Sequence, residues 1–309
     1  MDELDSILAI VGSRQDDFFV YAQPVHHPDE IVICRWRNGE WRKVFHNSIA
    51  TMRGRTSDGK GGLWMCLDRT QLMHFRKDGS VERYTNQLIE QSDFLDMALF
   101  RDNGVALLGL ETGLVQFNGT EFLHLLPDWV SGISKHPKFP SVLTPEFFCL
   151  EADSSDACWL SGSEGRLRRV QEGRWQEWQV GEKTEIWTAM LLIDGPPVTI
   201  FLGSNHGLLM KGVWTEEGGF QYRLIGQPCR HRFYDFTVAS DGTVYAIGDR
   251  LLVKLLDDSV EEINLGELTL QSATCCSGGF LIGTEDGVYV GPPWRKYPKI
   301  QLKLGKWDK

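Results

Sequence analysis

The stretch GVALLGLETGLVQFNGTEFLHL at residues 104–125 decides the fold. A short apolar run leads into the turn residues Glu-Thr-Gly, an alternating segment, an Asn-Gly pair and a further apolar segment. Asn-Gly flanked by alternating hydrophobic residues is the strongest short-range signal of a β-hairpin. The stretch therefore predicts three short antiparallel strands joined by two tight turns.

The same pattern recurs along the chain about every forty residues, the repeat length of a four-stranded propeller blade. The third to seventh copies also have an apolar segment upstream that ends in a turn rich in Asp, Gly and Ser, which makes four strands, A to D. A degenerate first copy places these strands at residues 6–11, 17–22, 31–36 and 40–44. With that copy included, we predict an all-β fold: residues 1–309 form a single domain, a seven-bladed β-propeller of four-stranded antiparallel blades.

Two further expectations follow from the repeat. One small residue ends most B strands, where a larger side chain would collide with a close neighbour. These residues are Cys66, Gly109, Gly162, Gly203, Gly248 and Gly283. For ring closure, we expect residues 6–11 to be strand A of the first blade and residues 299–304 to be strand D of the last blade. Each terminal blade then comes from its own end of the chain, without exchange of strands.

Three phrases resemble the repeat of two-component-regulator propellers. They are GLWMCLDRTQLMHF (62–75), LLGLETGLVQF (107–117) and FLIGTEDGVY (280–289). The pattern of that family is roughly Gly-Leu-Trp-Ile-Gly-Thr-x-x-Gly-Leu-x-x-Phe/Tyr, and the resemblance covers residues 59–290. It implies the propeller fold. It implies no function, because the phrase encodes strands and turns, and sensor propellers of the family are usually fused to other domains.

Composition narrows the setting of the protein. With 24% charged and 42% hydrophobic residues, the chain has the balance of a globular protein. No apolar run is long enough to cross a membrane, and the acidic N-terminus is unlike a signal peptide. The seven cysteines show no framework spacing, so we interpret them as small buried hydrophobic residues in a reducing compartment. We therefore expect a cytoplasmic protein.

Known catalytic motifs are missing from the sequence. It contains no P-loop, dinucleotide fingerprint, His-Glu-x-x-His or Gly-x-Ser-x-Gly, so we expect no cofactor. The segment His-His-Pro-Asp-Glu at residues 26–30 offers metal-ligand side chains, but neighbours on a loop point apart, and we predict a solvated loop and no metal. An enzyme resembling lactonase or lyase propellers stays an alternative, with His206 and Glu164 as the candidate residues for its site.

The B–C turns carry an unusual number of carboxylates. Read around the ring, these turns contain Asp29 and Glu30, Asp68, Glu111, Glu164, Asn205 and His206, Asp249, and Glu285 and Asp286. Glutamate does not favour turns for backbone reasons, and the chain has a net charge of −10. Such a ring would repel nucleic acid and attract a basic protein. Ordinary solubilising surface charge is the alternative explanation.

Two connections between blades add aromatic and basic groups on the same face. Residues 126–145 form an insertion that contains four prolines and the apolar residues Trp129 and Phe139. A stiff chain loses little entropy when it binds a partner, although the insertion could instead plug the channel or cover a blade edge. Residues 227–234 contribute Arg230 and Arg232.

These observations favour a monomeric, non-catalytic, protein-binding propeller that uses the B–C turns and D–A connections. Its sharpest form is an inhibitor or immunity protein of a bacterial toxin system. A lactonase-type or lyase-type enzyme and a sensory or structural module of a larger assembly are the alternatives. The residues expected at the partner site are Glu111, Trp129, Phe139, Glu164, His206, Arg230, Arg232, Glu285 and Asp286.

Overall fold

The structure is a computed structural model of the whole chain. It describes all residues except 1, 25–29, 49–51, 59, 68–70, 91–93, 101–103, 110–112, 126–132, 136–142, 156, 267, 269, 277–278, 286, 299 and 303–309.

Seven antiparallel sheets form the blades in the described chain, each with four strands A to D, and β31 (Gln301–Leu302) adds a fifth strand to the sheet of blade one. Blade one consists of β1 (Asp2–Arg14), β2 (Asp17–Pro24), β3 (Glu30–Arg37) and β4 (Glu40–Ser48). Blade two consists of β5 (Met52–Ser57), β6 (Leu63–Leu67), β7 (Gln71–Phe75) and β8 (Val81–Tyr84). Blade three consists of β9 (Phe94–Phe100), β10 (Gly104–Gly109), β11 (Gly113–Phe117) and β12 (Phe122–His124). Blade four consists of β15 (Phe147–Ala152), β16 (Cys158–Gly162), β17 (Arg166–Gln171) and β18 (Arg174–Gln179).

The last three blades follow the same order. Blade five is β19 (Trp187–Ile193), β20 (Val198–Ser204), β21 (Leu209–Thr215) and β22 (Gly219–Gly226). Blades six and seven are β23 (Phe233–Val238), β24 (Val244–Gly248), β25 (Leu251–Leu255), β26 (Val260–Glu262), and β27 (Ser272–Cys276), β28 (Gly279–Thr284), β29 (Gly287–Gly291), β30 (Arg295–Lys296). The helical elements described are α1 (Gln87–Glu90) and a 3-10 turn (Ser163–Gly165). The predicted seven-bladed, all-β propeller is confirmed.

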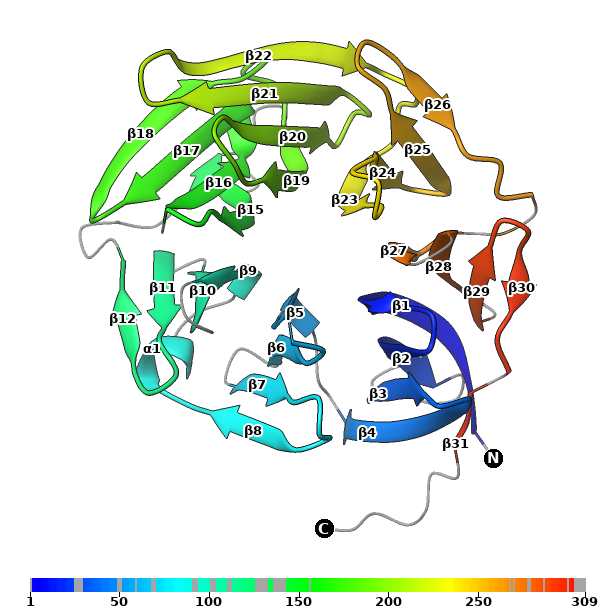
Figure 1. The fold of residues 1–309 in the computed structure, drawn as a ribbon. Helices are drawn as coiled ribbons and strands as arrows, with labels where there is room; N and C mark the ends of the chain where they lie inside the picture. Colours follow the sequence, from blue (N-terminus) through cyan, green and yellow to red (C-terminus); the bar gives the residue numbers. More distant parts are fainter. Residues whose placement is uncertain are drawn as a thin grey trace.

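The blades stand around a central axis, with the A strands innermost and the D strands at the rim (Figure 1). In the described part of the chain, seven clusters of buried hydrophobic residues each join two neighbouring blades. The B strands are buried along almost their whole length because a neighbouring blade covers each face. The core is therefore a closed belt between the blades.

The small residues at the ends of the B strands have the role that the sequence predicts. A Cβ atom on Gly203 of blade five would lie 2.7 Å from Cβ of Phe233 in blade six. A Cβ atom on Gly283 of blade seven would lie 2.6 Å from Cγ2 of Ile7 in blade one. Adjacent blades approach so closely here that only a small residue fits.

Ring closure differs from the prediction. The outer strand of blade seven is β30, which pairs with β29, whereas β31 (Gln301–Leu302) pairs with the start of β1 in blade one. The expectation that residues 299–304 complete the last blade without exchange of strands is therefore wrong.

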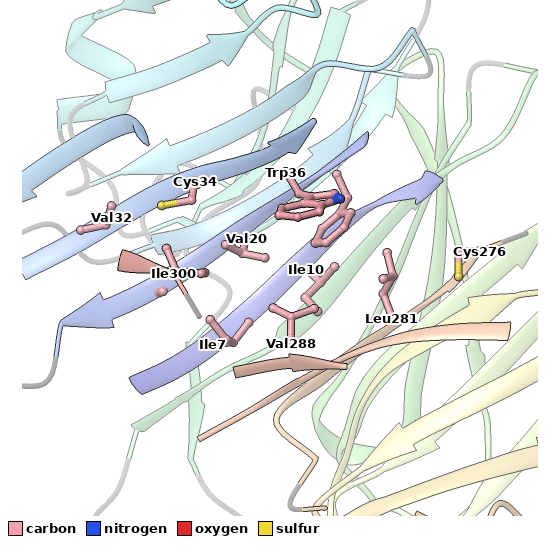
Figure 2. Packing of buried hydrophobic residues seen from close by; sticks show 12 residues of the cluster. Ile7, Ile10, Val20, Val32, Cys34, Trp36, Cys276, Leu281, Val288 and Ile300 are labelled. Carbon is pink, nitrogen blue, oxygen red and sulfur yellow. The ribbon is translucent and has the colours of Figure 1, made fainter. Parts of the chain in front are cut away.

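The physical reason for this crossing is apolar burial. Ile300 is buried in a cluster that contains Ile7 and Val32 of blade one, and Figure 2 shows these side chains together. The indole Nε1 of Trp41 also donates a hydrogen bond to the carbonyl of Pro298 at 2.8 Å. The chain gains more by crossing to blade one than by continuing along the exposed outer edge of blade seven.

Two other segments extend the sequence interpretation. The insertion at residues 126–145 contains an antiparallel hairpin, β13 (Ile133–Lys135) with β14 (Leu143–Pro145), where the sequence suggested a loop. Strand A of blade two, β5, was not found from the sequence because its residues are largely polar.

All seven cysteines are free, and six of them are buried, as expected of small hydrophobic residues. No described helix has the length and apolarity needed to cross a membrane.

Candidate functional site

The antiparallel order of the strands gives the ring two distinct faces. We call the face that carries the B–C turns and the D–A connections the B–C face, and the opposite one, with the A–B and C–D turns, the A–B face. Of the expected site residues, the structure places Glu164, His206, Arg230, Arg232 and Glu285 on the B–C face. Glu111, Trp129, Phe139 and Asp286 lie outside the described residues, so their role stays a prediction.

Glu164 has local partners that account for a glutamate in this turn. Its backbone adopts a left-handed conformation with φ of 58°. The Glu164 carboxylate accepts a hydrogen bond from Arg166 Nη2 at 2.5 Å, and Arg166 also pairs with Glu146. The carboxylate is thus tied into an ion-pair network within blade four.

His206 and the arginine-bearing connection form a continuous surface. Nε2 of Gln227 donates to the carbonyl of His206 at 2.9 Å. The turn packs so tightly on the connection that a Cβ atom on Gly207 would lie 2.2 Å from the carbonyl oxygen of Cys229. Arg230 and Arg232 are exposed beside this contact, and Glu285 is exposed on blade seven.

A cavity of about 270 Å³ opens into the central channel, and we call it the channel cavity. It is lined by the beginnings of strands β9, β15, β19 and β23 and by the middle of β5, so it lies toward the B–C face. Arg232 is the expected site residue that reaches it. The ionisable groups of its lining are Arg55, Asp96, Cys149, Glu151, Arg232, Tyr234 and Asp235.

Three carboxylates face one another in this cavity, and their partners differ. Asp96 accepts backbone hydrogen bonds from Met97 at 2.9 Å and from Leu150 of the next blade at 2.8 Å. Asp235 accepts one from its neighbour Phe236 and lies 3.2 Å from Nη2 of Arg55, across the channel. Among the described residues, Asp235 is the only one of the three carboxylates within ion-pair distance of a cationic side chain.

The surroundings make ionisation of these carboxylates costly. Burial, together with repulsion from Asp235, raises the pKa of Asp96 to about 7. Burial, and then repulsion from Asp96 and Asp235, raises the pKa of Glu151 well above its ordinary value. Burial also raises the pKa of Asp235, although Arg55 opposes that change. The cavity therefore holds carboxyl groups whose ionised forms are less favoured than those of free carboxylates.

Tyr234 also lines this cavity. Its hydroxyl oxygen is buried away from solvent and makes no hydrogen bond to any described residue. None of the residues that line the cavity is a histidine, and the described residues contain no group of three or more His, Cys, Asp or Glu that could hold a metal ion. The arrangement can bind a cationic, hydrogen-bonding group.

Sequence reasoning missed Arg55, Asp96, Glu151, Tyr234 and Asp235. A signal was present, since an apolar A strand that carries a single acidic residue occurs at β9, β15 and β23. The innermost strand lines the channel, so a lone carboxylate on it points to a group that faces the channel. The convergence of these three carboxylates depends on ring geometry, which no local pattern contains.

Comparisons with known proteins establish the fold alone. No family model and no curated protein matches the sequence. Among solved structures, virginiamycin B lyase from Staphylococcus aureus is similar with a TM-score of 0.65 and 12% identity, over 92% of this chain and 94% of that one. The extracellular domain of BT4673 from B. thetaiotaomicron, named for a hybrid two component system, gives 0.63 and 12% over 93% of this chain and 38% of that one. YCF48 bound to D1 peptide gives 0.62 and 11% over 93% and 92%. Propellers of this shape thus have varied functions.

Proposed function

We propose that this propeller binds a protein partner by accepting a cationic side chain of that partner in the channel cavity. The observation that carries the proposal is the excess of carboxyl groups there: Asp96 and Glu151 have no cationic side chain within ion-pair distance among the described residues. A lysine or arginine side chain would supply the missing charge.

The size of the cavity favours one side chain over a whole small-molecule ligand. Its volume of about 270 Å³ falls just below the range of roughly 300–1,000 Å³ that is usual for such ligands. The rest of the partner would then lie on the surrounding B–C face, where Arg230, His206 and Glu285 are placed. The fold supports this use, since one propeller of similar shape is a complex with a peptide.

The sharper form of the proposal is a cytoplasmic inhibitor or immunity protein that neutralises a cationic toxin. The net charge of −10 supports a basic partner, because it would accelerate the association of the two proteins. In this form Trp129 and Phe139 provide apolar anchors, and Glu111, Glu164, Glu285 and Asp286 guide the approach.

Titration calorimetry with two capped pentapeptides tests the proposal. One peptide has a central arginine, and the other has citrulline, which has nearly the same shape but no charge. We expect only the arginine peptide to bind. Because a cation favours ionised carboxylates, binding near pH 7 should release protons from Asp96 and Glu151, seen as a dependence of the heat on the buffer.

Two matched variants make the test specific to the cavity. Glu151→Gln removes one carboxylate and should weaken binding about tenfold or more, as expected when a charged hydrogen bond is lost. Glu217→Gln removes the same charge from an exposed turn of the opposite face and should change the affinity less than about threefold. Equal binding of the citrulline peptide, or equal effects of the two variants, would refute the cationic site.

A pull-down from the native host then identifies the partner. Bait with Glu151→Gln should lose a basic protein that the wild type retains. If the partner is retained by the variant, the channel cavity is not its docking site even where the peptide binds.

A further inference from the structure

A second cavity lies on the A–B face, the side opposite the proposed partner site. It has a volume of about 660 Å³, and we call it the basic cavity. It opens between blades one, two and three, because its lining comes from their A–B and C–D turns. The residues around it are Arg37, Asp58, Lys60, Trp64, His74, Arg76, Lys77, Asp78, Tyr84, Asn118 and Gly119.

The lining is positively charged in a protein that is otherwise acidic. Arg37, Lys60, Arg76 and Lys77 contribute four cations, against the two carboxylates of Asp58 and Asp78. The neighbouring cavity of about 490 Å³ shares Lys60 and Lys77 and adds Arg14 and the carboxylate of Asp17. A local excess of positive charge on a chain of net charge −10 is unexpected for a surface that only keeps the protein soluble.

The two carboxylates are already occupied by protein donors. Oδ1 of Asp58 accepts the backbone N–H groups of Lys60 and Gly62, each at 2.7 Å, and Oδ2 lies 3.0 Å from Nε2 of His74. Oδ1 of Asp78 accepts the N–H and hydroxyl groups of Ser80 within its own turn. These carboxylates hold the turns in place and leave cationic groups facing the cavity.

Three of the four cations, Arg37, Arg76 and Lys77, keep donors to spare. Nη1 of Arg37 donates to the carbonyl of Lys77 at 3.2 Å, and its contact with Asp17 is long, at 3.7 Å. Nη2 of Arg76 donates to Glu82 at 2.8 Å, and that side chain is half exposed. The ammonium group of Lys77 makes no ion pair with the residues that the structure describes. Guanidinium groups present five donors each, so both arginines retain free N–H groups.

The floor of the cavity is rigid and partly apolar. The rings of Trp64 and His74 stack at 4.0 Å with an angle of 8° between their planes, and both are nearly fully buried. The carboxylate of Asp58 lies 3.0 Å from Nε2 of His74 and holds that ring in place. Tyr84 also lines the cavity. Four cations above an aromatic floor suit an anionic head attached to an apolar body.

We propose that the basic cavity binds a small organic molecule that carries a multiply charged oxyanion, as a phosphate or a polycarboxylate group. Arginine and lysine together match such groups in charge and in hydrogen-bond donors. A volume of about 660 Å³ lies inside the usual range of roughly 300–1,000 Å³ for ligand sites. The site is independent of the channel cavity, which lies toward the other face.

Binding measurements at constant ionic strength test this inference. The probes are ATP, inorganic pyrophosphate and citrate, with chloride adjusted so that general screening is equal. Saturable binding of ATP or pyrophosphate identifies a phosphate site, and saturable binding of citrate alone identifies a carboxylate site; both support the inference. If none of the three saturates, the inference is overturned.

Charge-matched variants separate the cavity from the general surface. Lys77→Gln and Arg76→Gln should each raise the Kd about tenfold, the usual effect of losing one charge-assisted contact. Arg42→Gln removes the same charge from an exposed position on β4, outside the cavity, and should leave the Kd within about twofold. If Arg42→Gln weakens binding as much as Lys77→Gln, or if an acidic peptide saturates where the small anions do not, the assignment is wrong.

Discussion

Blades two and four carry the same constellation at their A–B turns, and they use it differently. The matching positions, in the order blade two and then blade four, are Asp58 and Asp153, Trp64 and Trp159, His74 and Arg169, and Tyr84 and Trp178. In both blades the first carboxylate oxygen closes the turn. Oδ1 of Asp58 accepts the backbone N–H groups at positions +2 and +4, and Oδ1 of Asp153 does the same.

The second carboxylate oxygen separates the two blades. In blade two, Oδ2 of Asp58 faces His74, and the indole N–H of Trp64 has no partner among the described residues. In blade four, Oδ2 of Asp153 accepts the indole N–H of Trp159 at 2.9 Å, and Nε of Arg169 has no such partner. The second oxygen of each aspartate thus lies near two possible hydrogen-bond partners. It bonds to His74 in blade two and to Trp159 in blade four.

The shapes of the neighbouring side chains explain the choice. His74 is short and flat, so it lies parallel to Trp64 and reaches Asp58. Arg169 is long, and its guanidinium group lies 4.2 Å from the ring centre of Trp214, while its Nη2 donates to the hydroxyl of Ser155 at 3.2 Å. Phe117 of blade three occupies the position that corresponds to Trp214 of blade five. Because phenylalanine is smaller than tryptophan, it helps to leave room for the basic cavity. The same framework therefore produces a filled blade interface in one place and the floor of a cavity in another.

The largest effect should come from removing either aspartate. In Asp153→Ala, the turn N–H groups of Ser155 and Ala157 and the indole of Trp159 lose their acceptor. At about 1–3 kcal/mol for each buried unsatisfied group, we expect a loss of about 3 kcal/mol or more in the free energy of unfolding. Asp58→Ala should cost somewhat less, because the carboxylate of Asp58 has three hydrogen-bond partners whereas that of Asp153 accepts four hydrogen bonds, one of them from the Ser155 hydroxyl.

Urea unfolding of both variants measures this difference. Asp241→Ala is the matched control, since it removes a turn aspartate that is exposed in blade six and should cost less than about 1 kcal/mol. If all three variants lose the same stability, the buried turn carboxylates have no special role.

The sequence predicts the repeated blades well, but it does not predict which side chains bond to one another within each blade. Strand and turn signals are local, so the blades and the tight contacts at Gly203 and Gly283 could be identified from periodicity and residue size. The framework of the two turns was also visible, because Asp58 and Trp64 have the same spacing as Asp153 and Trp159. Which donor bonds to each aspartate depends on side chains from the next blade, and no short window contains them.

The candidate site shows the same limit for a stronger reason. Arg55 and Asp235 are far apart in the chain and meet across the channel, so their pairing exists only in the closed ring. The crossing of β31 to blade one likewise follows from the burial of Ile300, which the strand pattern of the last blade does not contain. Arg232 was found because an exposed basic residue on a connection is conspicuous in the sequence.

A smaller effect should come from replacing the two indoles. Trp159→Phe removes a hydrogen bond to a charged acceptor, whereas Trp64→Phe removes a donor that has no partner among the described residues. The same atoms are lost in both variants, so the packing costs are similar. We expect Trp159→Phe to lose about 1–2 kcal/mol more than Trp64→Phe in urea unfolding. Equal losses would mean that the indole of Trp64 is hydrogen bonded in solution, and the contrast between the blades would fail.

The smallest effect should be a pH dependence that arises in blade two. Burial raises the pKa of Asp58, but hydrogen bonds from His74 and from the N–H groups of Gly62 and Lys60 outweigh it, and the net result is a lowered pKa. A lowered pKa in the folded state contributes stability that is present above the unfolded value of about 3.9 and is lost as pH falls through the folded value.

Asp58→Asn cannot titrate, so the stability difference between the wild type and this variant should shrink as pH falls below about 4. Urea midpoints measured from about pH 3 to pH 7 test this expectation. A wild-type curve that stays parallel to that of Asp58→Asn over the whole range would show that the hydrogen bonds to the Asp58 carboxylate do not stabilise the folded state.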